Sequence, residues 1–265
     1  MNRFGFYDPT SMLKAVGIAE DKPESRYLAG GQSLLPAMRL RLSSPSDLID
    51  LSGVAELRGI RKESEGLSIG AMTSHAEVAT SKEVTSSIPA LAELAGLIGD
   101  RQVRNRGTLG GSVANNDPAA DYPAAVLGLG ATVHVGKRKV AADDFFKGLF
   151  ETALKVGELL TSVTFPIPKK AGYAKFKNPA SRFAVVGVFV AQTTAGVRVA
   201  VTGAGANGVF RVKAMEDALS KNWSPDALKG IAVSSDGLIS DLHASAEYRA
   251  HLVTVMAQRA VAAAK

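Results

Sequence analysis

Apolar residues in the first fifty positions fall in short segments separated by turn residues, and this pattern predicts alternating strands and helices. Strands are expected at residues 4–7, 26–29 and 47–51, and helices at residues 12–20 and 34–42. Thr10 or Ser11 can cap the first helix, and Pro23 follows its end. Because the second strand runs directly into a glycine pair and then a helix, this lobe has the order of elements that a phosphate site requires.

After about residue 56 the apolar pattern predicts a second lobe that contains hairpins. The first hairpin is expected to pair residues 57–60 with 67–70, and the second to pair 131–135 with 138–141. Helices are expected after the Thr73-Ser74 cap, at 89–98 and at 123–129, and one more strand at 160–165.

Residues 166–172, with two prolines and a glycine, are expected to form a linker, because these residues disfavour both helices and strand pairing. Strands at 173–177, 184–192 and 197–202 predict an antiparallel sheet, and helices are expected at 213–220 and 248–264. We therefore predict an α+β protein. Its first domain would cover residues 1–168, with lobes at about 1–55 and 56–168, and a C-terminal domain would cover 169–265.

The composition excludes several classes of protein. The 265 residues are 46% hydrophobic and 21% charged, as in an ordinary folded protein. The net charge is +6, but the basic residues are scattered and no nucleic-acid-binding module is recognisable, so no nucleic acid partner is expected. The chain has no cysteine, so any iron–sulfur cluster must lie in another chain. No signal-peptide pattern or membrane-spanning run is present, and we expect a cytoplasmic protein.

Two glycine-bearing segments carry the clearest chemical signal. They are residues 29–36, Ala-Gly-Gly-Gln-Ser-Leu-Leu-Pro, and residues 106–115, Arg-Gly-Thr-Leu-Gly-Gly-Ser-Val-Ala-Asn. Glycine allows a positive φ and a close approach of the backbone to an anion, and Ser33 or Thr108 adds a hydroxyl donor. Either segment alone can be an ordinary turn, and the first matches neither a P-loop nor a Rossmann fingerprint. Together they predict a diphosphate held from both sides, and the branched side chain of a Gly110→Val variant is expected to lie against it.

Other candidate residues give weaker signals. The four histidines, His75 among them, have no partner at metal-ligand spacing, so no metal site is predicted. Asp143 and Asp144 fit a helix N-cap better than a catalytic carboxylate pair. Lys175 lies in a predicted strand just after the linker, where it could face either water or a cofactor cleft.

Several motifs occur in an order that is typical of one flavoprotein family. They are Phe4 with residues 7–9, then 29–36, 69–73, 104–114, 117–121, 158–160, 173–175 and 184–186. With these motifs the chain resembles, over nearly its whole length, the FAD-binding medium subunit of the molybdenum hydroxylases. This group includes carbon monoxide dehydrogenase and the flavin subunits of xanthine dehydrogenase and aldehyde oxidase. The resemblance implies a two-lobed FAD-binding domain of the molybdopterin dehydrogenase type, followed by a C-terminal α+β domain with an antiparallel sheet.

The resemblance also implies which residues hold the FAD. Residues 28–35 and 108–112 would hold its pyrophosphate, Asp121 would lie near it, and Leu160 and Lys175 would line the flavin. The full set of implied cofactor-binding residues is Leu28, Ala29, Gly30, Gly31, Gln32, Ser33, Leu34, Leu35, Thr73, Ile98, Thr108, Leu109, Gly110, Gly111, Ser112, Asp121, Leu160 and Lys175. No cysteine or obvious histidine lies at the glycine loops for covalent attachment, so dissociable FAD is expected.

The function implied by the resemblance is electron transfer. In this family a substrate is hydroxylated at the molybdopterin cofactor of a large subunit, and two 2Fe–2S clusters of a small subunit pass the electrons to FAD. The flavin then delivers them to NAD, quinone, oxygen or another acceptor. This chain would contribute no catalytic residue and would assemble with both partners as a dimer of heterotrimers. Two alternatives stay open: a self-sufficient FAD-dependent oxidase or dehydrogenase of the vanillyl-alcohol-oxidase-like superfamily, and a non-enzymatic nucleotide-binding subunit.

Overall fold

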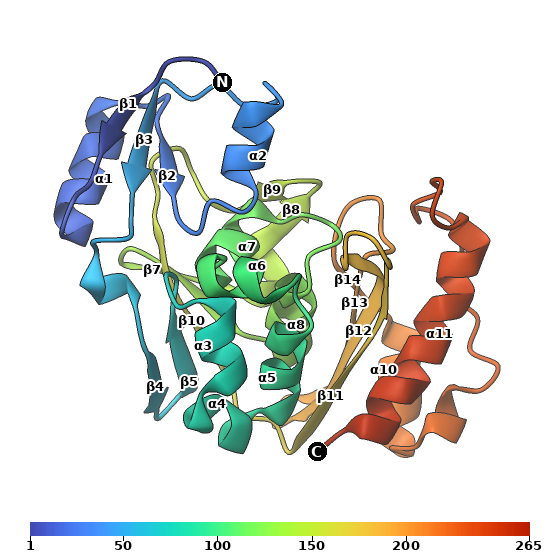
Figure 1. Ribbon diagram of the computed structural model, residues 1–265. Coiled ribbons are helices and arrows are strands. Elements are labelled where there is room, and N and C mark those ends of the chain that lie inside the picture. The colour runs from blue at the N-terminus through green and yellow to red at the C-terminus, as the bar shows by residue number, and fades with distance from the viewer.

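A small parallel sheet of order β1-β3-β2, with two helices beside it, forms the N-terminal lobe of the computed structural model, which describes residues 1–265 (Figure 1). Its elements are β1 (Gly5–Tyr7), α1 (Met12–Asp21), β2 (Arg26–Leu28), α2 (Leu34–Arg39) and β3 (Asp47–Asp50). The Ser11 hydroxyl accepts a hydrogen bond from the Lys14 N–H, which confirms one of the two expected caps of α1. The alternation of strands and helices expected from the sequence is therefore confirmed in this lobe.

An antiparallel sheet of order β4-β5-β10-β6-β7 forms one side of the second lobe. The elements of this lobe are η1 (Ala55–Leu57), β4 (Ile60–Glu63), β5 (Gly66–Gly70), α3 (His75–Thr80), α4 (Lys82–Ser87), α5 (Pro89–Gly96), α6 (Arg101–Arg106), α7 (Leu109–Asn115), α8 (Tyr122–Leu129), β6 (Thr132–Val135), β7 (Arg138–Ala141), α9 (Ala142–Phe145), β8 (Phe146–Gly148), β9 (Glu151–Thr152) and β10 (Leu160–Phe165). The second expected hairpin is confirmed. The first lies later in the chain than expected, because residues 55–57 form a 3-10 helix instead of a strand.

The C-terminal domain is a four-stranded antiparallel sheet with helices on its outer face. Its elements are β11 (Lys170–Lys177), β12 (Ala184–Thr193), β13 (Gly196–Thr202), β14 (Phe210–Arg211), α10 (Lys213–Lys221), η2 (Pro225–Leu228) and α11 (Ala246–Ala263). The expected antiparallel sheet is confirmed, and β14 adds a short fourth strand to the three that were predicted. The expected linker is partly wrong, since residues 170–172 already belong to β11. Gly172 pairs with Val190, and a Cβ on this glycine would collide with the Ala260 carbonyl of α11. Its role is therefore close packing under a helix.

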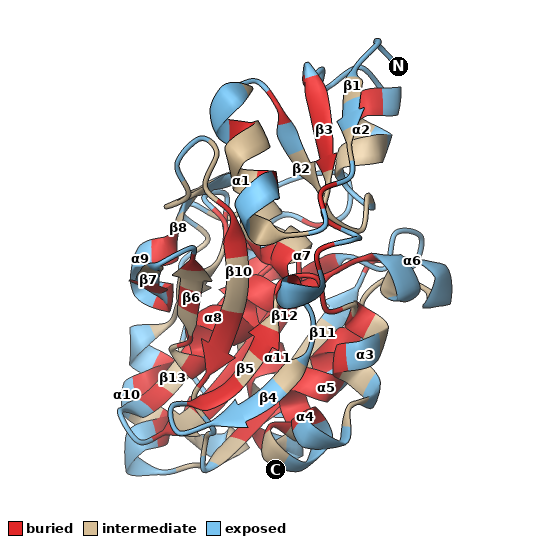
Figure 2. Ribbon diagram, turned by 90° about the vertical axis from the view of Figure 1, so that its left-hand side faces the viewer, coloured by how far each residue is buried: buried red, intermediate tan, exposed pale blue.

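The C-terminal sheet lies between two helical layers, with α5 and α8 on one side and α10 and α11 on the other (Figure 1). All eight residues of α8 are buried, and Figure 2 shows this helix in red at the centre of the molecule. A helix that is apolar all round belongs in a core. The largest hydrophobic cluster joins residues of α8 with Tyr173, Phe189 and Ala200 of the C-terminal sheet, so the two domains share this cluster. Separate clusters lie under α10 and α11 and in the N-terminal lobe. None of the helices combines the length and apolar character needed to cross a membrane.

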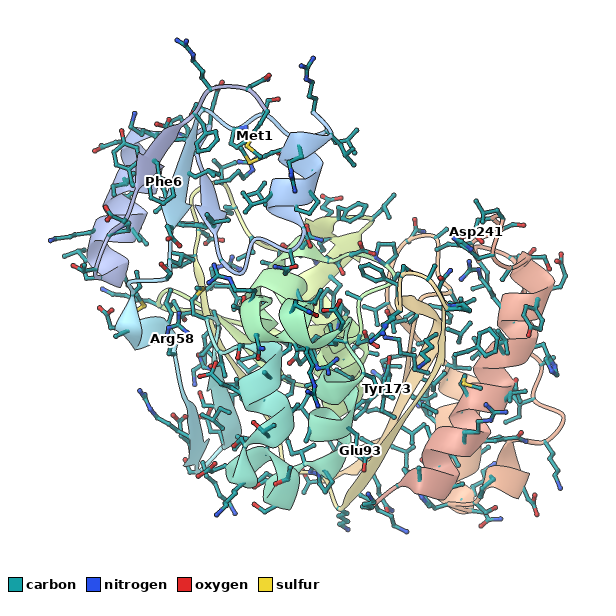
Figure 3. All side chains as sticks on the ribbon, viewed as in Figure 1. Met1, Phe6, Arg58, Glu93, Tyr173 and Asp241 are labelled. Carbon is teal, nitrogen blue, oxygen red and sulfur yellow. The ribbon has the colours of Figure 1, made fainter.

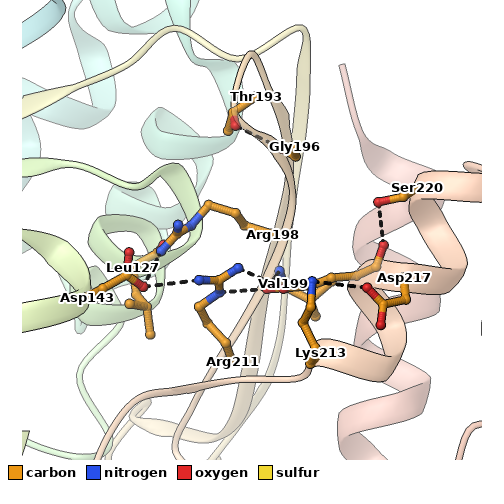
Figure 4. Close-up of polar contacts among 11 residues, drawn as sticks. Leu127, Asp143, Thr193, Gly196, Arg198, Val199, Arg211, Lys213, Asp217 and Ser220 are labelled. Atoms are coloured by element: carbon orange, nitrogen blue, oxygen red, sulfur yellow. Dashed lines mark hydrogen bonds and ion pairs between the residues drawn. The ribbon is translucent and has the colours of Figure 1, made fainter.

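Asp143 lies in an ion-pair network between the second lobe and the C-terminal sheet, which corrects its expected role as a helix N-cap (Figure 4). Its carboxylate pairs with Arg198 at 2.6 Å and with Arg211 at 3.2 Å. Arg211 also forms two hydrogen bonds of 2.7 Å to the buried Glu216 carboxylate. Burial alone would raise the pKa of Asp143, but the hydrogen bonds and charges of Arg198 and Arg211 have the larger combined effect and lower it.

Candidate functional site

The first glycine segment joins β2 to α2 and exposes a run of unpartnered backbone donors. The N–H groups of residues 30–35 donate no hydrogen bond within the chain, and the Ser33 hydroxyl does not cap α2. Gly31 has φ +71°, which turns successive N–H groups toward one side. A Cβ on Gly30 would collide with the Arg106 carbonyl and lie 2.6 Å from the Cα of Gly107. The first segment therefore presents a run of free backbone N–H donors, the kind of group that can hold an anion, and it is packed against the second segment.

The second glycine segment is mainly the helix α7, which corrects its expectation as a loop. Thr108 is the N-cap, and its hydroxyl accepts a hydrogen bond of 3.1 Å from the Gly111 N–H. The Gly110 N–H donates to the Ala71 carbonyl at 2.8 Å. No glycine of this segment has a positive φ, and a Cβ on Gly110 would collide with Ala71. The expectation that a side chain at this position would lie against a ligand is therefore wrong, because Gly110 permits close packing of α7 on the end of β5.

A cavity of about 590 Å³ opens between the two segments and extends to the C-terminal domain. The predicted residues that line it are Ala29, Gly30, Gly31, Gln32, Ser33, Leu34, Ile98, Thr108, Gly110, Gly111, Ser112, Asp121 and Leu160. Residues from both lobes and from the turn between β11 and β12 thus line the same cavity. A smaller hollow of about 280 Å³ lies elsewhere, against β4, β5 and β10, and contains none of the predicted residues.

Five predicted residues lie behind the wall of this cavity. Leu28 and Leu35 flank Gly31, and Leu109 is fully buried in the core. The Thr73 hydroxyl is buried and bonds to the backbone of Gly59 at 3.2 Å. Lys175 does not line the cavity either, but it contacts a residue that does. These five residues therefore lie behind the residues that line the cavity and do not line it themselves.

Asp121, Tyr173 and Lys175 form a buried polar cluster between the domains, and Tyr173 is labelled in Figure 3. The Lys175 ammonium lies 2.9 Å from one Asp121 oxygen and also donates to the Leu97 carbonyl at 3.2 Å. The Tyr173 hydroxyl donates to the other Asp121 oxygen at 2.5 Å. Burial raises the pKa of Asp121, and the Lys175 charge and the Tyr173 hydroxyl oppose that rise. The cluster places a carboxylate with both oxygens partnered at the cavity wall.

Several cavity residues had no predicted role. They are Arg26, Tyr27, Met72, His75, Phe150, Arg182 and Phe183. Met72 belongs to the motif at residues 69–73, so that motif could have indicated it. Phe150 and Phe183 are 58% and 47% exposed, and a flat ring system is a suitable partner for such aromatic faces. Arg182 has φ +63° and Phe150 has φ +55°, conformations that no sequence pattern of non-glycine residues reveals.

Comparisons with known proteins identify the family. The model of the FAD binding domain in molybdopterin dehydrogenase matches residues 2–168, and that of the CO dehydrogenase flavoprotein C-terminal domain matches residues 171–264. The nicotine 6-hydroxylase medium subunit of Paenarthrobacter nicotinovorans is 36% identical, covering 97% of this chain and 95% of its own. The carbon monoxide dehydrogenase medium chain of Afipia carboxidovorans is 35% identical, covering 99% and 96%.

Solved structures give the same result. The chain matches reconstituted CO dehydrogenase from Oligotropha carboxidovorans with a TM-score of 0.92 and 33% identity, over 99% of this chain and 97% of the other. It matches quinoline 2-oxidoreductase from Pseudomonas putida 86 with a TM-score of 0.88 and 31% identity, over 98% and 96%.

The fold and the cavity thus define a flavoprotein subunit of a molybdenum-containing dehydrogenase. More narrowly, the chain belongs to the FAD-binding medium subunits of the molybdopterin hydroxylases, the family of the carbon monoxide dehydrogenase medium chains. The fold class and the resemblance expected from the sequence are confirmed.

Proposed function

We propose that this chain holds FAD in the cavity between the glycine segments and transfers electrons from the iron–sulfur clusters of a partner subunit to an external acceptor. The observation that carries the proposal is the run of six backbone N–H groups, residues 30–35, without a partner in the chain. Such a run is a site for the negative charge of a pyrophosphate. The match to an FAD-binding domain model supports the same ligand.

The residues present fit a bound dinucleotide. Residues 30–35 and the Ser33 hydroxyl would hold the pyrophosphate on one side, and Thr108 with the start of α7 on the other. Ile98, Leu160 and the exposed faces of Phe150 and Phe183 would contact the ring systems. Asp121, held by Lys175 and Tyr173, would accept hydrogen bonds from ribityl or ribose hydroxyls. Because no covalent attachment point is proposed, the FAD would be dissociable.

When bound, FAD would supply a carrier that takes up electrons one at a time from the clusters and can release them singly or as a pair to the acceptor. The chain itself would orient the carrier and contribute no catalytic side chain. Relatives named medium chains and medium subunits support assembly with other subunits. We propose that a large subunit with the molybdopterin cofactor and a small subunit with two 2Fe–2S clusters are these partners, in a dimer of heterotrimers. The absence of cysteine here agrees with clusters held elsewhere.

Titration of the purified chain with FAD tests the cofactor. Saturable binding at one FAD per chain, followed by release of intact FAD on denaturation, is the expected result. A chain that takes up no FAD would overturn the proposal.

The electron path is tested in the assembled complex under anaerobic conditions. The iron–sulfur subunit is reduced chemically, and the visible absorbance of the flavin is followed with and without that subunit. Flavin reduction should require the iron–sulfur subunit. An isolated chain that reduces its own flavin with a small organic substrate would instead favour a self-sufficient oxidase, and FAD that is never reduced would favour a nucleotide-binding subunit.

A further inference from the structure

His75 lies at the point where the two glycine segments meet, yet nothing in the site described so far uses it. It is the first residue of α3, and its backbone N–H donates to the Gly107 carbonyl at 3.0 Å. The residue lines the cavity although it is only 5% exposed. On its other side the ring contacts Tyr122, with ring centroids 5.3 Å apart. The imidazole is therefore fixed between the core and the cavity.

The two ring nitrogens of His75 have different surroundings. Nδ1 is sealed from solvent and has no hydrogen-bond partner. Nε2 also has no hydrogen-bond partner in the chain, but unlike Nδ1 it is not sealed. It lies beside Gly107, whose added Cβ would come within 2.5 Å of it. Only Nε2 can therefore reach a molecule in the cavity.

The ring is neutral near pH 7, because burial, with a smaller effect from Arg104, lowers the pKa of His75 to about 4. A neutral imidazole carries one proton, on either Nδ1 or Nε2. Among buried backbone groups, an N–H without an acceptor is rarer than a carbonyl oxygen with an unused lone pair, and the same preference is expected for a sealed ring nitrogen. The proton is therefore favoured on Nε2, which makes the cavity-facing nitrogen a donor.

We propose that His75 is a cofactor-binding residue whose Nε2–H donates a hydrogen bond to an acceptor oxygen of the bound dinucleotide. The inference rests on the proposed binding of FAD. Gly107 directly precedes the N-cap Thr108 and abuts Gly30, so the donor lies close to both walls of the pyrophosphate site. A phosphate oxygen and an oxygen of the ribityl or flavin part share this acceptor chemistry.

Three substitutions test the role of Nε2. Gln carries an amide near the position of Nε2, Asn carries one near Nδ1, and Leu carries neither. His75→Leu and His75→Asn should weaken FAD binding about fivefold to tenfold, the range expected for one hydrogen bond. His75→Gln should stay within about twofold of the wild type, in line with a retained donor. The exposed His251→Leu is the matched control and should bind FAD like the wild type.

A spectroscopic measurement reads the tautomer directly. In a protein labelled with ¹⁵N at histidine, the His75 resonances should show the Nε2–H form, and the Nε2–H signal should shift when FAD is added. Titrations with ADP and with riboflavin then identify the acceptor. A loss of ADP affinity in His75→Leu points to a phosphate oxygen, and a loss of riboflavin affinity points to the flavin end. Circular dichroism of each variant checks that it is folded.

Equal FAD affinity in the wild type and in His75→Leu would overturn the role of His75 and leave the proposed function intact. An Nδ1–H tautomer that does not change when FAD is added would have the same two consequences. A wild-type chain that binds no FAD would overturn the proposed function, and this inference with it. The two failures are thus distinguishable.

Discussion

Gly31 and Gly110 occupy opposite walls of the cavity but are required for different reasons. Gly31 has φ +71°, a conformation that side chains other than glycine rarely adopt, and it orients the free N–H groups around it. Gly110 has an ordinary helical conformation, and glycine is required there because Ala71 leaves no room for a side chain. The sequence indicated that both glycines matter, but it could not separate a conformational need from a packing need. That separation depends on which backbone lies opposite each glycine.

Gly31→Ala tests the conformational role. The left-handed region costs an alanine about 1 kcal/mol, and its Cβ would lie 2.8 Å from Leu35 Cδ1, so the segment must shift. We expect FAD affinity to fall about tenfold or more, because the N–H groups of residues 30–35 lose their common direction. Gly136→Ala is the matched control: its φ is +55°, and nothing lies within 4 Å of the added Cβ. It should show similar strain in chemical denaturation and unchanged FAD binding, and equal FAD losses in both variants would contradict the assignment.

The buried His75 predicts a specific pH dependence of stability. Its pKa is about 4 in the folded protein and near 6.5 when unfolded, so the unfolded chain binds more protons between these values. The contribution of the neutral His75 to the unfolding free energy is therefore complete above about pH 6.5, and it is lost as the pH drops toward about 4. From about pH 7 to about pH 5 the His75 contribution should fall by about 2 kcal/mol. Urea denaturation of the apo protein at both pH values measures the loss, and His75→Gln should lose about that much less than the wild type. An equal loss in both would contradict a depressed pKa.

At the scale of elements, the sequence predicted the longer helices and the antiparallel sheet but missed α4, α6 and α7. The α7 segment contains two glycines, which have low helix propensity, so its helix depends on the Thr108 cap and on packing against β5 and β10. Asp121 and Lys175 were both indicated by motifs. Their contact could not be derived, because 54 residues separate them and the pairing depends on how the C-terminal sheet packs against α5 and α8. Tyr173, which completes the cluster, lies in the motif at residues 173–175, but no role was predicted for it.

Lys175→Met tests the energetic role of this cluster. The side chains of Lys175 and Asp121 are 2% and 4% exposed, so removal of the cation leaves a buried carboxylate without its counter-charge. We expect a loss of about 3 kcal/mol or more in unfolding free energy. The double variant Asp121→Asn with Lys175→Met should lose less than the sum of the single variants, because both charges are then gone.

Lys265→Met is the matched control for that substitution. Lys265 pairs with Glu93 at 2.6 Å, but the two side chains are 64% and 43% exposed. Its loss should change stability by less than about 1 kcal/mol, as for other surface pairs. Chemical denaturation of the apo proteins measures all four variants. Similar effects of Lys175→Met and Lys265→Met would show that the buried pair contributes no more than a surface one.

At the scale of the whole molecule, the boundary near residue 168 divides the chain in sequence but not in its hydrophobic core. Phe189 on β12 is fully buried, and its ring lies 2.9 Å from the Cβ that an alanine would place at Gly128 of α8. The C-terminal sheet thus covers a helix that has no polar face. The cavity also depends on both domains, since Ser181, Arg182 and Phe183 of the C-terminal domain line part of it. Two family models therefore describe parts that complete each other's core and site.

Phe189→Ala measures the shared core. Removing a fully buried ring should cost about 3–5 kcal/mol, and the unfolding transition of the whole chain should move as one unit because both domains contribute to the same cluster. Phe176→Ala, on the neighbouring strand β11 and 37% exposed, should cost clearly less. Two separate transitions in the Phe189→Ala variant would contradict a single cooperative core.

A chain truncated after residue 168 tests the domain boundary itself. Without β11, β12 and β13, the faces of α5 and α8 that they cover would be open to water, and exposed apolar surface of that kind drives association. We expect residues 1–168 to aggregate or to lack a cooperative unfolding transition, and to bind FAD much more weakly than the full chain. Size-exclusion chromatography, thermal unfolding and FAD titration measure the three properties. A monomeric fragment that unfolds cooperatively and binds FAD with full affinity would show that the first domain is independent, and that the C-terminal sheet serves another part of the complex.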